Sequence, residues 1–161
     1  MNNPGVLKVG FIGLGRMGGG MSRRILSAGY DLVVYDVFPA KAAELGTAGA
    51  RVASSIADAC KGRDVVMTML VEDTVLNYVA LGAGGLRDSL PPGAIHLVMG
   101  THGVATIRSL AATHEKSKQV LVAAPVLGRP DLAAYGQLGI VAAGPADAVL
   151  RCDPLFQILG G

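Results

Sequence analysis

The sequence predicts a doubly wound α/β domain, in which a mostly parallel sheet carries helices on both faces. Six apolar runs are continuous rather than alternating, as in strands that are buried on both faces. The segments between them are amphipathic or alanine-rich and long enough for a helix. A repeated strand-helix order implies parallel pairing with right-handed crossovers. We expect the chain, 1–161, to form one domain.

Each apolar run is expected to be one strand of this sheet. In order, the runs are VGFIG (9–13), LVVYD (32–36), DVVMTML (64–70), AIHLVM (94–99), VLVAAPV (120–126) and LGIVAAG (138–144). All six are expected to pair in parallel, because a helix-length segment precedes each return to the sheet.

Helices are expected between these runs and after the last one. Their predicted ranges are 17–28, 39–46, 54–61, 73–80, 103–116 and 145–158. Gly29 follows the first helix as a stop, and Pro39 begins the second, where its missing N–H costs nothing. The segment 82–93 is expected to be a loop with at most one turn of helix.

The composition suggests that part of the surface requires a partner. Charged residues make up 16% of the chain and hydrophobic ones 51%, whereas about 25% charged residues are usual in globular domains. Because monomers rarely leave large apolar patches in water, we expect either another copy of the chain or another domain as a neighbour.

Charge and cysteine usage exclude several classes of function. The net charge is +2 with basic residues scattered along the chain, so nucleic acid is not an expected partner. No apolar run approaches the roughly 18 residues of a membrane span. Cys60 and Cys152 have no metal or redox spacing and are expected to be free, buried thiols, and no metal site is expected. With no leader pattern at the N-terminus, we expect a cytoplasmic protein.

A glycine motif closes the first strand. It reads G-x-G-x-x-G and stands between a predicted strand and a predicted helix, the context of a dinucleotide-binding Rossmann fold. The first glycine permits a tight turn, the second lets a pyrophosphate approach the backbone, and the third lets helix and strand pack closely. The residues expected to hold the pyrophosphate are Gly13, Leu14, Gly15, Arg16, Met17 and Gly18. The alternative is a merely flexible turn, which the further glycines Gly19 and Gly20 favour.

Asp36, at the end of the second predicted strand, bears on the choice of cofactor. A carboxylate there accepts hydrogen bonds from the ribose hydroxyls but repels a 2′-phosphate, so NAD is preferred. NADP stays the second candidate because Lys41 lies nearby in the sequence. The alternative reading is that Asp36 only initiates the turn before the next helix.

The stretch GFIGLGRMGGGMSRRIL (10–26) resembles the N-terminal signature of the β-hydroxyacid dehydrogenases, which include 3-hydroxyisobutyrate dehydrogenase and, more distantly, the imine reductases. Three further stretches match in order: VVMTMLVED (65–73), VMGTHGVATIRSL (98–110) and AAPVLGRPDLAAYGQLGIVAAG (123–144). The resemblance implies that further residues hold the cofactor, namely Met69, Leu70, Val71 and Thr101. It also implies a substrate segment formed by Leu127, Gly128 and Arg129.

Two departures concern the substrate. Leu127 stands where the family usually has a serine that hydrogen-bonds the substrate, and an apolar side chain makes no such bond. Arg129 replaces a glycine and is either a carboxylate clamp or a solvated side chain. His102, beside Thr101, is either a proton-exchanging group or an ordinary loop histidine.

The predicted function is that of the cofactor-binding domain of an NAD(P)-dependent oxidoreductase. The resemblance implies hydride transfer between nicotinamide and a small 3-hydroxy acid or a related carbonyl or imine. It also implies a further helical domain, absent here, which supplies the catalytic lysine. Lys61, Lys116 and Lys118 are expected to lie away from the strand ends, so that role is not assigned to any of them. We therefore expect this chain alone to be inactive. The alternative is a non-catalytic NAD-binding module or remnant, and the substrate and oligomeric state stay open.

Overall fold

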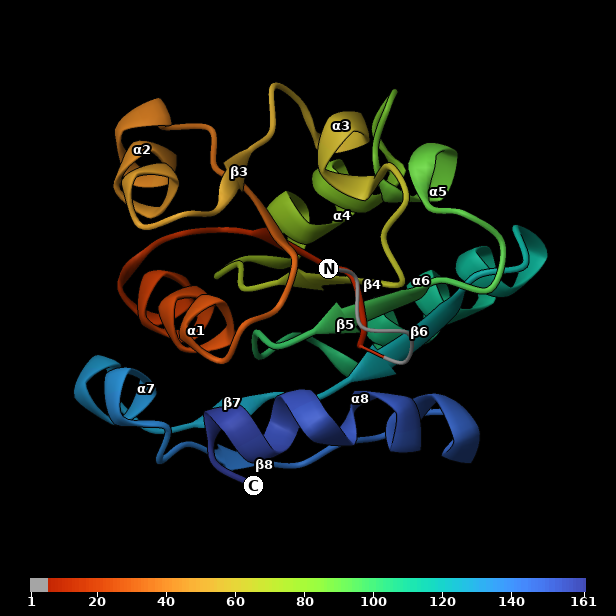
Figure 1. Cartoon of the computed structure of the whole chain (residues 1–161). Helices are drawn as coiled ribbons and strands as arrows, with labels where there is room; N and C mark the ends of the chain where they lie inside the picture. The colour runs from red at the N-terminus through yellow and green to blue at the C-terminus, as the bar shows by residue number, and fades with distance from the viewer. Residues whose placement is uncertain (1–5) are drawn as a thin grey trace.

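A six-stranded parallel sheet forms the centre of the computed structural model, which describes residues 6–161 (Figure 1). Its strands are β1 (Val9–Ile12), β2 (Leu32–Tyr35), β3 (Arg51–Val52), β4 (Val65–Thr68), β5 (Ile95–Val98) and β6 (Val120–Ala123). Their spatial order is β3-β2-β1-β4-β5-β6, and each neighbouring pair is parallel. The predicted doubly wound fold is confirmed, and its strand order reverses between β1 and β4, where such sheets bind ligands.

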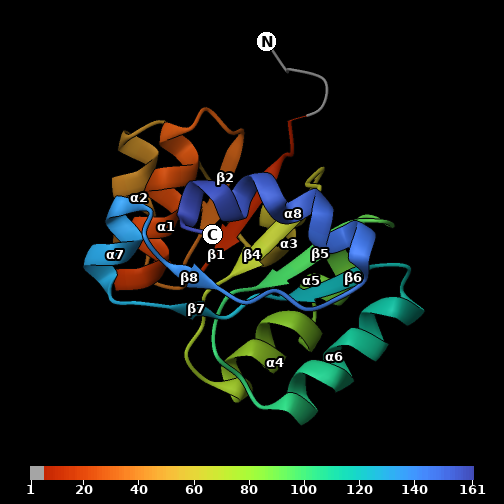
Figure 2. The ribbon, with the colours of Figure 1, turned by 90° about the horizontal axis from the view of Figure 1, so that it is seen from below.

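Helices cover both faces of the sheet, as Figures 1 and 2 show. One face carries α1 (Arg16–Ser27), α2 (Pro39–Thr47), α7 (Pro130–Tyr135) and α8 (Ala146–Leu159). The other carries α3 (Ile56–Cys60), α4 (Asp73–Leu81), α5 (Leu86–Ser89) and α6 (Val104–Lys116). Successive residues of a strand point to opposite faces, so Phe11 belongs to the first apolar cluster and Ile12 to the second.

The prediction for 138–144 as a parallel strand of the main sheet is wrong. Within it, β8 (Gly139–Ile140) pairs antiparallel with β7 (Val126–Leu127) in a separate two-stranded sheet. Ala143 then forms an isolated antiparallel bridge with Ala123. A parallel neighbour requires a helical crossover of a dozen or more residues over the sheet. The short α7 packs against α1 instead, so the chain returns beside β6 in the opposite direction.

Two elements were not predicted. One is the edge strand β3, whose two residues are both exposed and therefore give no apolar run. Helix α7 lies in the stretch treated as a substrate loop, although Pro130 at its first position, Asp131 in its first turn and Gly136 at its end are typical helix signals. The segment 82–93 contains the single helical turn α5, as expected.

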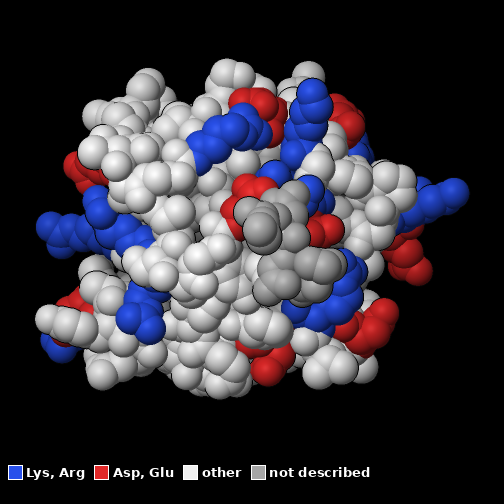
Figure 3. Space-filling model, in the orientation of Figure 1, with Lys and Arg blue, Asp and Glu red and all other residues white. Residues whose placement is uncertain are grey.

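The surface and the thiols complete the description. On the face that Figure 3 shows, positive and negative side chains are interspersed. Cys60 and Cys152 are buried and unpaired. Within residues 6–161, every helix is too short or too polar to cross a bilayer.

Candidate functional site

The glycine motif lies where β1 and β4 end. Gly13 follows β1 with a φ of +98°, a left-handed conformation that side chains rarely adopt. A Cβ there would overlap the carbonyl oxygen of Met69 and come within 3.0 Å of the Leu70 side chain. Glycine at this position therefore lets the turn after β1 lie directly against the segment that follows β4.

Gly18 and Gly15 have different roles in this turn: Gly18 permits close packing, and Gly15 leaves open space. Gly18 is buried in the first turn of α1, where a Cβ would overlap the carbonyl of Gly13. Gly15, the N-cap of α1, is exposed and has open space where a Cβ would stand. Having no side chain, Gly15 leaves the first amides of α1 facing that space, the arrangement that binds phosphate at helix N-termini.

The other residues of the motif differ in their accessibility. Arg16 is exposed, Met17 is half-buried, and the side chain of Leu14 is buried. Gly19 and Gly20 lie inside α1, and Gly19 donates a helical hydrogen bond to Gly15 at 2.7 Å. The interpretation of these last two glycines as part of a loose turn is wrong, because the helix has already begun.

Asp36 follows β2 and faces the glycine motif. Its Oδ2 accepts a hydrogen bond from the amide of Leu14 at 2.8 Å, and its Oδ1 accepts one from the amide of Phe38 at 2.9 Å. The carboxylate thus begins the next turn and also lies at the carboxyl edge of the sheet, where the segments that follow β1, β2, β4 and β5 meet; we call this edge the crevice. A carboxylate has about four acceptor positions, so two stay free for a ligand. The Nζ of Lys41 lies over the Phe38 ring, 5.1 Å from its centre.

Backbone hydrogen bonds set the remaining predicted segments in a row along this edge. The amide of Met69 donates to Ile12 at 3.0 Å, and the amide of Val126 donates to Met99 at 3.2 Å. These bonds place 69–71 beside the glycine motif, and 126–129 beside the strand end that leads to Thr101. Thr101 is exposed, Met69 and Leu70 are half-buried, and Val71 is 90% exposed.

The predicted substrate segment lies at the far end of this row. Leu127 in β7 is 65% exposed, and Gly128 has a φ of +147° with Leu132 and Leu138 packed against it. Arg129 is the N-cap of α7, and its guanidinium contacts Asp131 at 3.3 Å on the surface. The three residues are adjacent to the crevice, and the exposed side chain of Leu127 among them is apolar.

A cavity of about 320 Å³ adjoins Thr101 at the ends of β5 and β6. Its lining is mostly apolar, and Arg108 on α6 is its one cationic side chain. The lining residues are Gly100, Thr101, His102, Val104, Ile107, Arg108, Ala123, Pro125, Val141 and Ala143.

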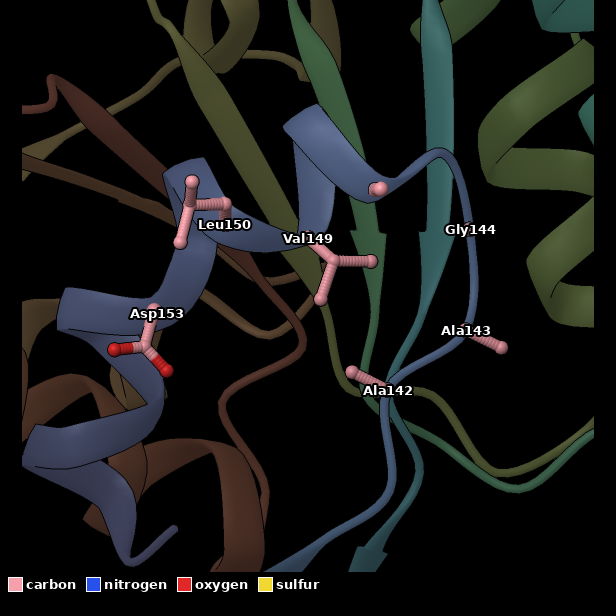
Figure 4. A pocket seen from close by; sticks show the side chains of 7 residues that line it. Ala142, Ala143, Gly144, Val149, Leu150 and Asp153 are labelled. Atoms are coloured by element: carbon pink, nitrogen blue, oxygen red, sulfur yellow. The ribbon is translucent and has the colours of Figure 1, made fainter.

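A second hollow, of about 390 Å³, lies at the start of α8 (Figure 4). Small and aliphatic side chains line it together with Asp153. None of the predicted site residues lies among those that line it.

One pair of side chains at the crevice was missed. The side chain of His102, a loop residue, is buried, and its Nδ1 donates to Asp73 Oδ1 at 2.8 Å. This hydrogen bond, with a second one from Thr106, lowers the pKa of the Asp73 carboxyl. Asp73 belongs to the first turn of α4, where a carboxylate is common for helical reasons alone, so the sequence carried no signal for the pair.

Residues 8–161 match the family model described as the NAD binding domain of 6-phosphogluconate dehydrogenase. An uncharacterized oxidoreductase, YfjR, from Bacillus subtilis is 42% identical over 95% of this chain and 54% of its own length. The NAD-dependent L-serine dehydrogenase of Pseudomonas aeruginosa is 35% identical over 95% of this chain and 51% of its own.

Solved structures agree in fold. The 3-hydroxyisobutyrate dehydrogenase of Mycobacterium tuberculosis, solved with L-serine, has a TM-score of 0.89 and 26% identity, covering 97% of this chain and 53% of that one. Psf3, solved with NADP+ and 2-OPP, has a TM-score of 0.90 and 27% identity over 94% of this chain and 54% of its own. The chain thus spans about half the length of the proteins that it matches.

Proposed function

This chain belongs to the family of the NAD binding domain of 6-phosphogluconate dehydrogenase, and we propose that it binds a nicotinamide dinucleotide along the carboxyl edge of its sheet. In this proposal the pyrophosphate lies over 14–18, the adenosine ribose on Asp36, and the nicotinamide beside 69–71 and Thr101. The predicted likeness to the 3-hydroxyisobutyrate dehydrogenases is confirmed by the similarity to the Mycobacterium tuberculosis enzyme described above.

The observation that carries the proposal is the joint geometry of the glycine motif and Asp36. Gly13 and Gly18 permit a close turn, Gly15 leaves the start of α1 open, and the carboxylate stands 2.8 Å from the amide of Leu14. The positive end of the α1 dipole favours a pyrophosphate, while Asp36 offers acceptors to a ribose.

We propose NAD as the preferred cofactor. The two free acceptor positions of Asp36 suit the neutral ribose hydroxyls of NAD, which can donate hydrogen bonds to them. The 2′-phosphate of NADP would instead meet a like charge there. Lys41, which would offset that charge, is engaged over the Phe38 ring. NADP is the second candidate, since a structural neighbour was solved with NADP+.

For the reaction, we propose hydride transfer with a small 3-hydroxy acid or a related carbonyl or imine. When bound, the cofactor supplies the hydride chemistry. The protein positions it, and the amide of Gly128 and the side chain of Arg129 are the candidate substrate contacts. Leu127 makes an unmodified hydroxy-acid site less suitable, because it cannot hydrogen-bond a substrate hydroxyl. We place the proton-transfer lysine in a helical domain that these 161 residues do not contain.

The proposal includes a partner for the carboxyl edge. Val71, Val104, Leu127 and Val141 are exposed there, and such apolar side chains are typically covered by protein or ligand. We propose that a helical domain or a second copy covers them. Free buried thiols suit a reducing compartment, and the cytoplasm is the proposed location.

The test is a fluorescence titration of NADH and NADPH on the wild type, Asp36→Ala and Asp31→Ala. Asp31 and Asp36 flank the same strand at opposite ends, so Asp31→Ala is a matched control. Wild type should prefer NADH, and Asp36→Ala should weaken NADH by about tenfold or more, the size of a lost charged hydrogen bond, with a smaller effect on NADPH. Asp31→Ala should leave the Kd values unchanged. Tighter NADPH binding by the wild type would overturn the preference.

The same samples report turnover. With NAD+ and 3-hydroxyisobutyrate or L-serine, the chain alone should produce no NADH, and addition of the helical domain of a relative should restore hydride transfer. Turnover by the chain alone would show that a proton-transfer residue lies within these residues.

A further inference from the structure

One carboxylate joins the starts of two helices beside the crevice. Asp73 belongs to the first turn of α4. Its Oδ2 accepts a hydrogen bond, 3.2 Å long, from the amide of Gly103, the N-cap residue of α6. Oδ2 also accepts the hydroxyl of Thr106 at 2.9 Å. The positive ends of two helix dipoles therefore face one negative charge, which both stabilise.

The third partner of this carboxylate is the imidazole of His102. Carboxylates only accept hydrogen bonds, so Nδ1 carries the proton in the 2.8 Å bond to Oδ1. The imidazole has no exposed surface, whereas the Asp73 side chain is 40% exposed. The other ring nitrogen, Nε2, is buried and has no hydrogen-bond partner among the residues that the structure describes. A buried polar atom without a partner is costly, so this ring position carries a free-energy penalty.

Gly100 makes room for that ring. A Cβ at this position would overlap the carbonyl oxygen of Leu70 and stand 2.8 Å from His102 Nε2. Gly100 thus lies close to both the Leu70 backbone and the imidazole, with no room for a side chain between them.

The two loops held in this way are those proposed to contact the nicotinamide. Asp73 comes two residues after Val71, and His102 directly follows Thr101. The Asp73–His102 bond spans 29 residues of sequence and, among the described residues, is the shortest of the hydrogen bonds that Asp73 makes to the segment after β5. We propose that Asp73 and His102 are positioning residues that hold 69–71 and Thr101 at the spacing the nicotinamide requires. This inference rests on the proposed function.

A positioning role and a purely structural role can be told apart by which part of the cofactor loses affinity. ADP-ribose contains the adenosine and pyrophosphate but no nicotinamide, and its proposed contacts are the glycine motif and Asp36. Loss of the Asp73–His102 bond should therefore weaken NADH and spare ADP-ribose, whereas general loss of structure should weaken both.

The experiment measures both Kd values by calorimetry for the wild type, Asp73→Asn, His102→Leu and His102→Asn. Asp73→Asn and His102→Leu should weaken NADH by about tenfold, the scale of one charge-assisted hydrogen bond, and leave ADP-ribose within about twofold. His102→Asn keeps an N–H near the position of Nδ1 and should recover most of the NADH affinity. Asp31→Asn, which removes a charge at the opposite edge, is the control.

The outcomes are distinct. Equal weakening of both ligands, unchanged NADH affinity, or no recovery in His102→Asn would overturn the inference while leaving the proposed function in place. If Asp73→Asn does not fold, the two His102 variants decide the question. Failure of the wild type to bind either ligand would overturn the proposed function, and this inference with it.

Discussion

At the scale of the residue, the tightest constraint in the crevice is at Gly18. A Cβ there would overlap the backbone carbonyl of Gly13, and backbone cannot move aside as a flexible side chain can. The neighbouring Gly19 occupies the same helix, but a Cβ there would meet only the carbonyl of Leu14, at an ordinary 3.5 Å. The two glycines therefore form a natural pair for comparison.

We predict that Gly18→Ala destabilises the domain and weakens NADH, because the turn must shift away from α1. Overpacking of this kind costs about 1–3 kcal/mol. Gly19→Ala should instead stabilise by up to about 1 kcal/mol, through the better helix propensity of alanine. Urea unfolding followed by circular dichroism measures the stability of both variants, and the fluorescence titration described above measures their affinity for NADH. An unaffected Gly18→Ala variant would show that the close approach of α1 to the turn is not required.

The residue scale also shows what sequence alone can predict about the site. Gly13, Gly18 and Asp36 lie as expected, because turn chemistry and motif spacing are local properties. The pair Asp73 and His102 was not predicted, since a contact between residues 29 apart depends on how two loops meet after folding. The fit of Gly100 against the imidazole was likewise not predicted, because it too depends on how these loops meet.

At the scale of the element, a buried chain of polar side chains crosses from β4 to α6 and β6. Thr68 contacts His96 Nε2 at 3.0 Å, His96 Nδ1 contacts His114 Nε2 at 2.9 Å, and His114 Nδ1 contacts Gln119 Oε1 at 2.7 Å. Gln119 donates its amide hydrogens to the carbonyls of Arg87 and Leu90. All four of these hydrogen-bonded side chains are buried.

The donors in this chain can be assigned from one end. The Gln119 oxygen only accepts, so His114 Nδ1 carries a proton and its Nε2 accepts from His96 Nδ1. His96 Nε2 then accepts from the hydroxyl of Thr68. With both imidazoles neutral, each hydrogen bond of this series has one donor and one acceptor. Burial accordingly lowers the pKa of His96 well below its usual value, and that of His114 as well.

We predict that the domain loses stability as the pH falls below about 6.5, the pKa of an unfolded histidine. The native state disfavours protonation of these imidazoles while the unfolded chain binds protons, so each lowers the free energy of unfolding by up to about 1.4 kcal/mol per pH unit as the pH falls. About one pH unit above 6.5 the contribution is complete and constant. Urea unfolding between pH 7.5 and 5.5 measures the slope.

The variant His96→Leu provides the control for this slope. It should be less stable at every pH, because Thr68 and His114 each lose a buried partner. Its slope below pH 6.5 should nevertheless be shallower than that of the wild type, since one neutral imidazole has gone. An unchanged slope would assign the acid sensitivity to other groups.

Prediction of the elements succeeded where burial leaves a pattern and failed where it does not. Strands β1, β2, β4 and β5 are apolar on both faces and were found close to their predicted bounds. The exposed pair Arg51 and Val52 forms β3 through backbone pairing alone. The run 138–144 is as apolar as a central strand, and its antiparallel direction depends on the path of α7, which no local pattern records.

At the scale of the whole molecule, one sheet separates two apolar clusters, and each contains one thiol. Cys152 on α8 belongs to the cluster with α1 and α2, and Cys60 on α3 belongs to the cluster with α4 and α6. Both clusters share the same strands, so opening of either exposes the sheet on which the other packs. We therefore expect residues 6–161 to unfold as one cooperative unit.

The two thiols offer a direct test of this cooperativity. Burial raises the pKa of Cys60 to about 12 and that of Cys152 to about 11, so neither forms thiolate in the native protein at neutral pH. We predict that a pulse of N-ethylmaleimide labels neither cysteine without urea, and that both become labelled at one urea midpoint, the same as that seen by circular dichroism. Peptide mass spectrometry reports each site separately in the wild type, so no cysteine needs to be replaced. Labelling of Cys152 at lower urea than Cys60 would mean that α8 leaves the sheet first, and the chain would then contain two units of stability rather than one.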